Sequence, residues 1–371
     1  MAYISDLKNH DVPTEETTTL SGLKLSDFNA EVEGKTISLY VLKNKNGLES
    51  CITNYGGRLV SLMVPDKNGK LIDVVLGFDK IDDYFKSFSY FGALIGRYAN
   101  RISNSSFMLD GVEYKLNGFG QHCLHGGIKG YHACIWNATQ INGQTLELSY
   151  FSPDGDAGFP GNINIKVTYT LTDDNEIDIQ YEATTDKPTV INLTNHSYFN
   201  ISGTYGSNVL EHLIQINADE FTPLDSTFIP TGAIESVTET PMDLRKLTYI
   251  GAHIDDNYAQ LKMSKGYDHN WILNTNGNIN ELAAKAISEN SGIVMDVYTN
   301  EPCMQFYTGM GASRLKGKSG VSYPSRGAFC LETQHYPNSP NQPNFPNSVI
   351  RPGEKYLSRC IYKFSVQNSA L

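Results

Sequence analysis

The sequence lacks the segments that carry a protein into or across a membrane. No apolar run reaches 18 residues in the 371-residue chain, so no membrane-spanning helix is predicted. The first 22 residues, MAYISDLKNHDVPTEETTTLSG, have no apolar stretch after a basic start, and a signal peptide is not expected. We predict a cytoplasmic protein, while a periplasmic location stays open if a signal peptide has been removed from the chain.

Positive charge is also in short supply. The chain has 29 Lys and Arg against 40 Asp and Glu, which gives a formal net charge of −11. Nucleic-acid binding depends on neutralising phosphates, and attraction to anionic membranes needs basic clusters, so neither partner is expected. A neutral small molecule is compatible with this charge balance.

The six cysteines form no C-x-x-C pair, which argues against a zinc site built on thiolates. Because they are scattered along a long chain, we expect reduced and mostly buried thiols. His122 and His125 have no further ligands at metal-site spacing, and no metal is predicted. Nucleotide-binding and nucleophile-elbow motifs are missing too, so we expect chemistry without a cofactor.

Helical periodicity is scarce, whereas strand and turn patterns recur along the chain. Asn-Gly and Asp-Gly dipeptides separate short alternating runs, as is typical of hairpins. In 162–184, apolar residues alternate on both sides of a polar turn at 173–175. A second strand pair is expected at 293–298 and 303–308. Short helices are expected at 79–86, 242–246 and 280–284.

The 22 Tyr and 16 Phe also suit a β-rich protein, because aromatic side chains pack well on pleated surfaces. We predict an all-β fold: one large antiparallel β-sandwich with a few short helices and with N- and C-terminal strands in a common core. Residues 26–371 form a single domain, and residues 1–25 form an N-terminal extension. The Pro-rich stretch 336–353 is a loop, either a surface connection or the rim of a site.

Two polar motifs follow apolar strands and contain candidates for proton transfer. In NHSYFN (195–200) the preceding run VINL delivers His196 to a polar edge, and histidine exchanges protons near neutral pH. In FCLETQHYP (329–337) Glu332 likewise follows an apolar strand. The structural alternatives are a core histidine and a solvated carboxylate at a strand end.

GRYANRI (96–102) contains side chains suited to a polyhydroxylated ligand. Arg97 and Arg101 are four residues apart, and Asn100 stands beside the second. Arginine offers a fixed fork of donors, and the Asn amide both donates and accepts. The structural alternative is a pair of ordinary charges at an exposed strand end.

Two further motifs combine a polar side chain with glycine or aromatic residues. LHGG (124–127) places His125 before two glycines, which permit close approach of a ligand to the backbone. YDHNWIL (267–273) places Asp268 near Trp271, and a carboxylate there can accept from two sugar hydroxyls. A core histidine and a core Trp are the structural alternatives.

Taken in order, the motifs resemble those of the aldose 1-epimerase (galactose mutarotase) family. No single motif would suffice, but eight follow one another at family-like spacing. They are NYGGRLVSLMVPDKNGKLIDVVLGFD (54–79), GRYANRI (96–102), LHGG (124–127), SPDGDAGFPG (152–161), NLTNHSYFN (192–200), YDHNW (267–271), QFYTG (305–309) and LETQHYPNSPNQPNFP (331–346).

The resemblance implies a galactose mutarotase-like supersandwich that interconverts the α and β anomers of free hexoses such as galactose and glucose. Glu332 matches the family's general base and His196 its general acid. The residues that match or flank the sugar-binding positions are Asn100, Arg101, His125, Ser197, Tyr198, Asp268 and Gln305. Of these, Ser197 and Tyr198 are expected to shape the surroundings of His196.

The implied reaction is a ring opening by paired proton transfers. Glu332 takes the proton of the C1 hydroxyl while His196 protonates the ring oxygen, C1 turns about C1–C2, and the same pair closes the other face. This direction requires a protonated His196 and an ionised Glu332 at the start. The preferred aldose and the choice between monomer and homodimer stay open.

Three rival functions remain at this point. A hexose-6-phosphate 1-epimerase would need extra cations for the phosphate, for which Arg58, Arg97 and Arg314 are candidates. A non-catalytic sugar-binding β-sandwich would have no reason to keep both an acid and a base. A glycosidase would need two carboxylates across the bond, and Asp268 with Glu332 is the one pair to consider.

Overall fold

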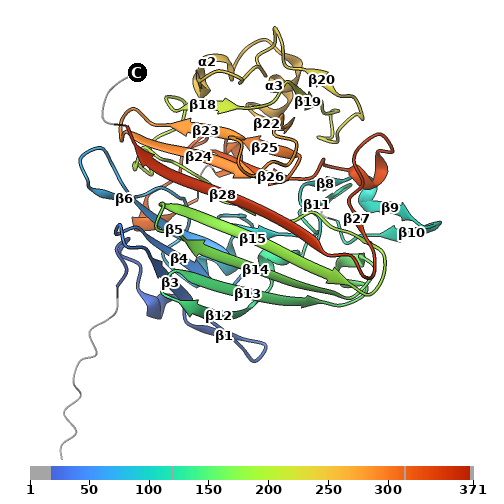
Figure 1. Ribbon diagram of the computed structural model, residues 1–371, viewed down its shortest axis with the longest axis horizontal. Helices are drawn as coiled ribbons and strands as arrows, with labels where there is room; N and C mark the ends of the chain where they lie inside the picture. The colour runs from blue at the N-terminus through green and yellow to red at the C-terminus, as the bar shows by residue number, and fades with distance from the viewer. Residues whose placement is uncertain (1–17, 119, 313–314, 368–371) are drawn as a thin grey trace, which may run out of the picture.

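The computed structural model describes residues 18–118, 120–312 and 315–367, and strands dominate this part of the chain (Figure 1). Its largest sheet is antiparallel throughout and has nine strands. They are, in spatial order, β12 (Asn137–Asn142), β13 (Thr145–Ser152), β14 (Ile163–Leu171), β15 (Glu176–Thr185), β28 (Tyr356–Val366), β24 (Ile293–Thr299), β23 (Ala284–Ile287), β18 (Leu213–Ile216) and β21 (Thr248–Tyr249). The predicted all-β fold is confirmed.

Smaller antiparallel sheets complete the architecture. A five-stranded sheet has the order β20 (Glu235–Ser236), β19 (Glu220–Thr222), β22 (Asp268–Ile272), β25 (Cys303–Tyr307) and β26 (Cys330–Gln334). A four-stranded sheet has the order β3 (Leu39–Lys43), β4 (Glu49–Thr53), β5 (Arg58–Pro65) and β6 (Leu71–Asp73). The two-stranded pairs are β1 (Ala30–Val32) with β2 (Lys35–Ile37), β9 (Ser106–Leu109) with β10 (Val112–Lys115), β8 (Arg101–Ile102) with β11 (Cys123–Leu124), β16 (Thr189–Val190) with β27 (Val349–Ile350), and β7 (Ala93–Ile95) with β17 (Thr194–His196).

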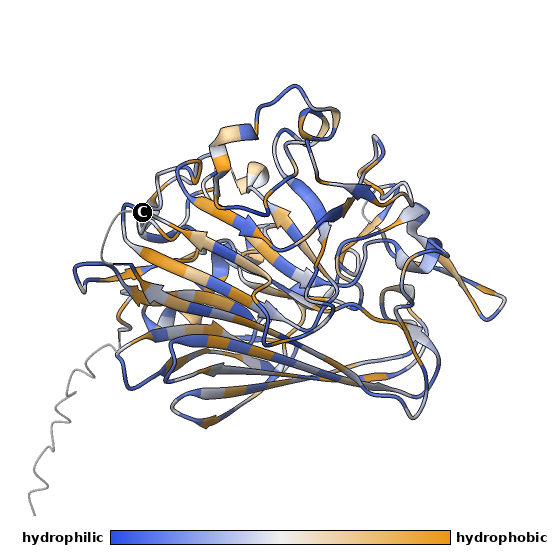
Figure 2. Cartoon of the chain, turned by 45° about the horizontal axis from the view of Figure 1, so that its top comes forward, coloured by the Kyte–Doolittle hydropathy of each residue, from blue (hydrophilic) through white to orange (hydrophobic). Residues whose placement is uncertain are grey.

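The alternation read in 162–184 is the pattern of a half-buried hairpin. Strand β14 buries every second residue, and β15 continues the pattern with Val167 opposite Tyr181 and Tyr169 opposite Ile179. The strands of the large sheet show this mixture of apolar and polar residues in Figure 2. One apolar core contains both Leu59 of β5 and Tyr362 of β28, so the predicted common core of N- and C-terminal strands is confirmed.

The expected pairing of 293–298 with 303–308 is wrong, although both segments are strands. Strand β24 pairs with β23 and β28 in the nine-stranded sheet, whereas β25 pairs with β22 and β26 in the five-stranded sheet. The short connection between them therefore crosses from one sheet to the other instead of closing a hairpin. Short loops favour hairpins, and here packing between sheets overrides that preference.

One of the three expected helices forms. The helix α1 (Ile81–Lys86) confirms the expectation at 79–86, but 242–246 and 280–283 are irregular segments, and Ala284 begins β23. Their backbone groups bond to neighbouring strands instead: the Leu244 carbonyl accepts from Ile216, and the Ala283 N–H donates to Val297. Two short helices at α2 (Ile250–His253) and α3 (Ala259–Ser264) were not anticipated.

Single 3₁₀ turns mark many of the connections. They are η1 (Leu25–Phe28), η2 (Ser103–Ser105), η3 (Tyr131–Ala133), η4 (Asp156–Gly158), η5 (Met310–Ala312), η6 (Lys318–Gly320) and η7 (Ser339–Asn341). The Pro-rich stretch 336–353 contains η7 and the short strand β27, so the prediction that it forms no central strand is confirmed. Its Asn338 is buried and donates its N–H to the Arg101 carbonyl, 2.8 Å away.

The chain termini and surface complete the picture. Residues 1–17 of the predicted N-terminal extension lie outside the described residues, but Leu23 is buried and the Leu20 N–H donates to the buried carboxylate of Glu49. All six cysteines are unpaired thiols and five are buried, as predicted.

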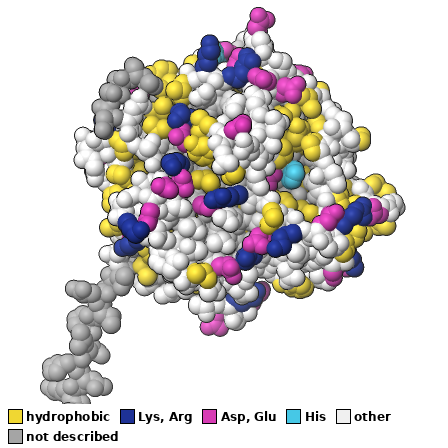
Figure 3. Space-filling model, in the orientation of Figure 1, with side chains coloured by type: hydrophobic (Ala, Val, Ile, Leu, Met, Phe, Trp, Pro, Cys, Tyr) yellow, Lys and Arg dark blue, Asp and Glu magenta, His cyan; other side chains and the backbone are white. Residues whose placement is uncertain are grey.

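In the described part of the chain no helix has the length and apolar character to span a bilayer. Acidic and basic side chains are interspersed on the face in Figure 3.

Candidate active site

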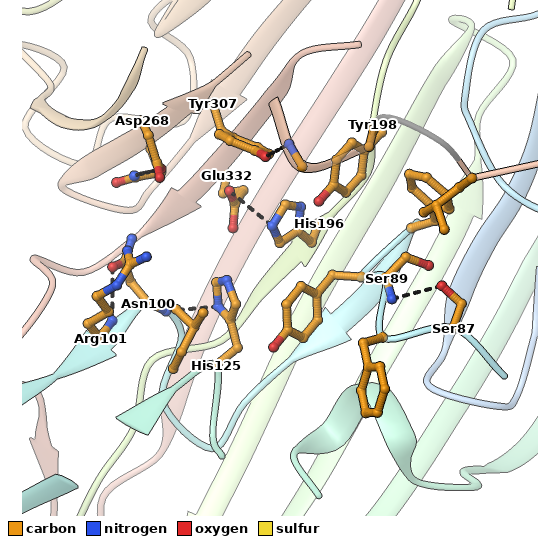
Figure 4. Close-up of a pocket in the computed structure, with 18 of the residues that line it drawn as sticks. Ser87, Ser89, Asn100, Arg101, His125, His196, Tyr198, Asp268, Tyr307 and Glu332 are labelled. Atoms are coloured by element: carbon orange, nitrogen blue, oxygen red, sulfur yellow. Dashed lines mark hydrogen bonds and ion pairs between the residues drawn. The ribbon is translucent and has the colours of Figure 1, made fainter. Parts of the chain in front are cut away.

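A cavity of about 490 Å³ brings together segments that are far apart in the sequence (Figure 4). That volume lies in the usual range for small-molecule sites. The lining includes eight residues predicted from the motifs, namely Asn100, Arg101, His125, His196, Tyr198, Asp268, Gln305 and Glu332. The other lining residues are Lys86, Ser87, Phe88, Ser89, Tyr90, Phe91, Leu124, Tyr307, Gly311, Ala312 and Leu315.

Strand register explains why the acidic and amide groups share one face. Gln305 of β25 lies directly opposite Glu332 of β26, and Tyr307, two residues further along β25, lies opposite Asp268 of β22. Residues two apart on a strand point to the same side, as do directly paired residues. The five-stranded sheet therefore presents these four side chains together to the cavity.

His196 reaches the same cavity from another sheet. It ends β17, where it lies opposite Ala93 of β7, and its Nε2 is 3.6 Å from Oε1 of Glu332. Both side chains are almost fully buried, with 5% and 2% exposure. The predicted acid and base are thus direct neighbours, although they are 136 positions apart in the sequence.

Burial shifts both members of this pair toward their uncharged forms. It lowers the pKa of His196 to about 3. The pKa of Glu332 is raised well above its usual value, first by burial and then by the Asp268 charge, while Arg101 opposes the shift. Burial therefore favours a protonated Glu332 and a neutral His196, which is the reverse of the charge state that the expected direction of transfer requires.

His125 is held in a defined tautomer. Its backbone is left-handed, with φ of +53°, and its Nδ1 accepts the Asn100 N–H at 3.1 Å. In the neutral ring the proton must then sit on Nε2. Burial lowers the pKa of His125 well below its usual value, so the ring stays neutral and offers Nε2–H as a donor.

The two glycines after His125 serve the backbone rather than a ligand. A Cβ at Gly126 would lie 1.9 Å from the Gly96 carbonyl oxygen, and one at Gly127 would lie 2.3 Å from the Asn117 carbonyl oxygen. Both residues also have positive φ. The expected close approach therefore occurs, but the partner is the chain itself.

Asp268 and Gln305 form a bonded pair at the cavity wall. Gln305 Nε2 donates to Asp268 Oδ1 at 2.7 Å. Burial raises the pKa of Asp268, while the nearby Arg101 and the Gln305 bond lower it. The Arg101 guanidinium also stacks 5.2 Å from the centre of the Phe228 ring.

Two predicted contacts are corrected by the structure. Arg97 does not join Arg101: it is buried and donates to the Pro160 carbonyl at 2.6 Å and to Ser152 Oγ at 2.7 Å. Ser197 does not line the cavity but donates from Oγ to Asn195 Oδ1 at 2.5 Å. Alternate residues of an extended segment face opposite sides, so a strand that turns His196 inward turns its neighbours away.

Aromatic rings surround the His196 imidazole. Tyr198 stacks on it with centroids 4.8 Å apart and planes within 6°, and Tyr307 meets it edge-on at 6.3 Å. Tyr90 is also nearly parallel to it, at 5.6 Å. Neither Tyr307 nor Tyr90 was predicted. Strand alternation from Gln305 could have found Tyr307, but 86–91 carries no motif that would reveal Tyr90.

A metal ion is a second possible occupant, because one ligand atom each from His125, His196 and Glu332 lies within 4.8 Å of the others. Metal binding needs an unprotonated ring nitrogen. The Asn100 bond assigns the Nε2 of His125 a proton, so this donor set suits a hydroxylated ligand better than a cation.

Comparison with known proteins decides the family. The sequence pattern of aldose 1-epimerases matches residues 38–363. The chain belongs to the aldose 1-epimerase family. It is 43% identical over 317 residues to galactose mutarotase of Bos taurus, covering 85% of this chain and 90% of that protein, and 37% identical over 335 residues to aldose 1-epimerase of Escherichia coli K12, covering 90% and 96%.

Solved structures agree with this family. A GalM/aldose epimerase homologue from C. elegans has a TM-score of 0.80 and 35% identity, covering 89% of this chain and 99% of that one. Galactose 1-epimerase from Lactobacillus acidophilus has a TM-score of 0.80 at 26% identity, covering 91% and 97%. Membership of the family confirms the predicted enzyme class, an isomerase that interconverts aldose anomers.

Proposed function

We propose that this aldose 1-epimerase acts on free galactose and glucose, with Glu332 and His196 exchanging protons with the sugar. The observation that carries the proposal is the separation of 3.6 Å between His196 Nε2 and Glu332 Oε1, both of which line the cavity. Two groups at this separation can contact the C1 hydroxyl and the ring oxygen, which are bonded to the same carbon.

The chemistry needs one proton on the pair at all times. Glu332 accepts the C1 hydroxyl proton as His196 gives a proton to the ring oxygen, the C–O bond opens, and the aldehyde turns before the reverse transfers close the ring. Burial favours the proton on Glu332, so in the proposed direction the proton has to move to His196 before the ring opens. Arg101 assists, because its charge favours the ionised form of Glu332.

The remaining side chains hold the sugar so that only C1 is free to turn. Asp268 and Gln305 present a carboxylate and an amide to sugar hydroxyls, and Arg101 presents a guanidinium fork. The Nε2–H of His125 supplies a neutral donor beside His196. Fixing the other hydroxyls in this way holds C1 in the geometry that the proton transfers need, which speeds the reaction.

The phosphorylated-sugar alternative is not favoured, because two of its three candidate cations are committed elsewhere. Arg58 donates to the carbonyls of Ser89, Phe91 and His132, and Arg97 is buried among main-chain and hydroxyl acceptors. Arg314 lies outside the described residues. Neither Arg58 nor Arg97 lines the cavity.

Polarimetry tests the proposal directly. Fresh α-D-galactose and α-D-glucose should reach their equilibrium rotation faster with the protein than in buffer alone, whereas glucose 6-phosphate should show little enhancement. Enhancement restricted to the phosphate ester would overturn the substrate assignment. No enhancement with any aldose, in a protein that melts cooperatively, would overturn the activity on these sugars.

The cytoplasm is the proposed location, because reducing compartments keep thiols unpaired and all six cysteines are free. A monomer or homodimer without nucleic-acid or membrane partners remains our expectation. Membership of the aldose 1-epimerase family supports a small sugar substrate as a partner.

A further inference from the structure

Tyr90 lies where three histidine rings meet, in a segment that no motif contains. Its ring centre is 4.7 Å from that of His125 and 4.9 Å from that of His132, and both contacts are edge-on. The ring of His196 lies 5.6 Å away, with the two planes within 12°. Tyr90 therefore touches both cavity histidines that face the proposed reaction centre.

The orientation of His196 depends on such ring contacts. Its Nδ1 is buried and makes no hydrogen bond to another residue among those the structure describes. By contrast, the Nδ1 of His125 is bonded to Asn100. The terminal torsion of a histidine side chain has broad wells, and the 3.6 Å contact of Nε2 with Glu332 is long, so packing on the ring faces is needed to hold one orientation. Tyr90 and Tyr198 provide the two nearly parallel surfaces.

Arg58 fixes the backbone on both sides of Tyr90. Its Nη1 donates to the carbonyls of Ser89 at 3.2 Å and Phe91 at 3.0 Å, and its Nη2 donates to the His132 carbonyl at 3.0 Å. The guanidinium is fully buried. One rigid fork thus ties the neighbours of Tyr90 to the main chain of His132.

We propose that Tyr90 is a positioning residue, which holds the imidazole of His196 in the orientation and tautomer that proton transfer requires, and that Arg58 holds Tyr90 in place. The inference rests on the proposed function for its kinetic consequence. It uses the aromatic ring of Tyr90 and not its hydroxyl, so Phe should replace Tyr90 without loss while Leu should not.

The kinetic test compares Y90L with Y90F, and uses F151L as the matched control. Phe151 is an exposed ring on β13 that does not line the cavity. With galactose, Y90L should lower kcat about tenfold or more while KM changes less than about threefold, because misorientation affects the transfer step. Y90F and F151L should stay within about twofold of the wild type. A kcat of Y90L within twofold, or a loss carried by KM, overturns the proposal.

Nitrogen NMR of ¹⁵N-histidine protein gives a readout that does not need turnover. The wild type and Y90F should show one and the same tautomer for His196, and Y90L should show a different tautomer ratio. If the wild type fails to accelerate mutarotation, the proposed function is wrong, and these spectra alone decide the inference: an unchanged His196 tautomer in Y90L overturns it.

Should Y90L fail to fold, R58K replaces it, since Lys keeps the charge but cannot span three carbonyls. A lower kcat at unchanged KM supports the proposal, and an unchanged kcat overturns it.

Discussion

The N–H of Asn100 donates to Nδ1 of His125 at 3.1 Å, and this bond makes a cavity histidine a neutral donor. The free edge of the ring faces His196 and Glu332 (Figure 4). A second histidine, His122, has the same bond, with Nδ1 accepting the Asn104 N–H at 2.9 Å, but it does not line the cavity. Substitutions of His125 and His122 therefore form a matched pair, in which the first tests catalysis and the second tests the loss of the same local bond.

Replacing His125 by Asn should lower kcat/KM for galactose about ten- to hundredfold. The variant loses the Nε2–H donor of the imidazole, which would bond a sugar oxygen that gains charge during ring opening. Asn tolerates the left-handed backbone of this position, with φ of +53°, so the fold should persist. The change is measured by polarimetry. H122N should leave the rate unchanged, and equal effects of both substitutions would mean that the loss is structural.

The catalytic pair makes a stronger prediction. E332Q and H196N each keep the shape of the side chain but remove its proton exchange, and each should lower kcat about 10²–10⁴-fold. The double variant should lose little more than the worse single variant, because the two groups act in one concerted exchange. Near-wild-type mutarotation by E332Q would contradict the base assignment, and an undiminished kcat of H196N would contradict the acid assignment.

The pH dependence of kcat/KM should report a pair that holds one proton. Activity falls on the acid side when the pair gains a second proton and on the alkaline side when it loses its last. Because the pKa of His196 is lowered to about 3, no inflection is expected near 6.5, the usual histidine value. Initial rates between pH 4 and 9, corrected for the buffer reaction, check this. An acid limb centred on 6.5 would contradict it.

The residues of the site could be predicted from short motifs because each motif combines chemistry with strand position. His196 ends β17 as predicted, whereas Glu332 lies in the middle of β26 and not after its strand. That they meet depends on how β17 and β26 pack, which no local pattern encodes. The contact between them therefore came from the family resemblance at the sequence level and from the three-dimensional fold afterwards.

Predictions failed where non-local partners decide the outcome. Arg97 and Arg101 look alike in GRYANRI, yet Arg97 binds carbonyls supplied by the distant residues Pro160 and Gly161. Strands β24 and β25 are joined by a short loop but belong to different sheets. The backbone on both sides of Tyr90 is held by Arg58 of β5. In each case the local sequence shows the side chain but does not show which distant residue it contacts.

The Asp268 carboxylate influences both binding and titration. Its charge raises the pKa of Glu332, so D268N, which is nearly isosteric, should shift the alkaline limb of the pH profile to lower pH. KM for galactose should rise at the same time, because an acceptor for hydroxyls is lost. Q305A should raise KM without the pH shift, since it removes the 2.7 Å bond to Asp268 but no charge. An unmoved alkaline limb in D268N would contradict the electrostatic argument.

Acid should destabilise the fold beginning just below pH 6.5. Burial lowers the pKa of six histidines in the folded state, and the shift is large for five of them: His125, His132, His196, His212 and His269. The unfolded chain titrates near 6.5 and so binds more protons as the pH falls, which lowers the free energy of unfolding by about 1.4 kcal/mol per pH unit for each such histidine. The raised pKa values of Asp268 and Glu332 act in the opposite direction at low pH, but two groups only partly offset five. Urea unfolding at pH 7 and pH 5.5 should therefore show a marked loss of stability, and H269N, at a buried ring outside the cavity, should reduce the difference. Equal stability at the two pH values would show that these rings titrate alike in both states.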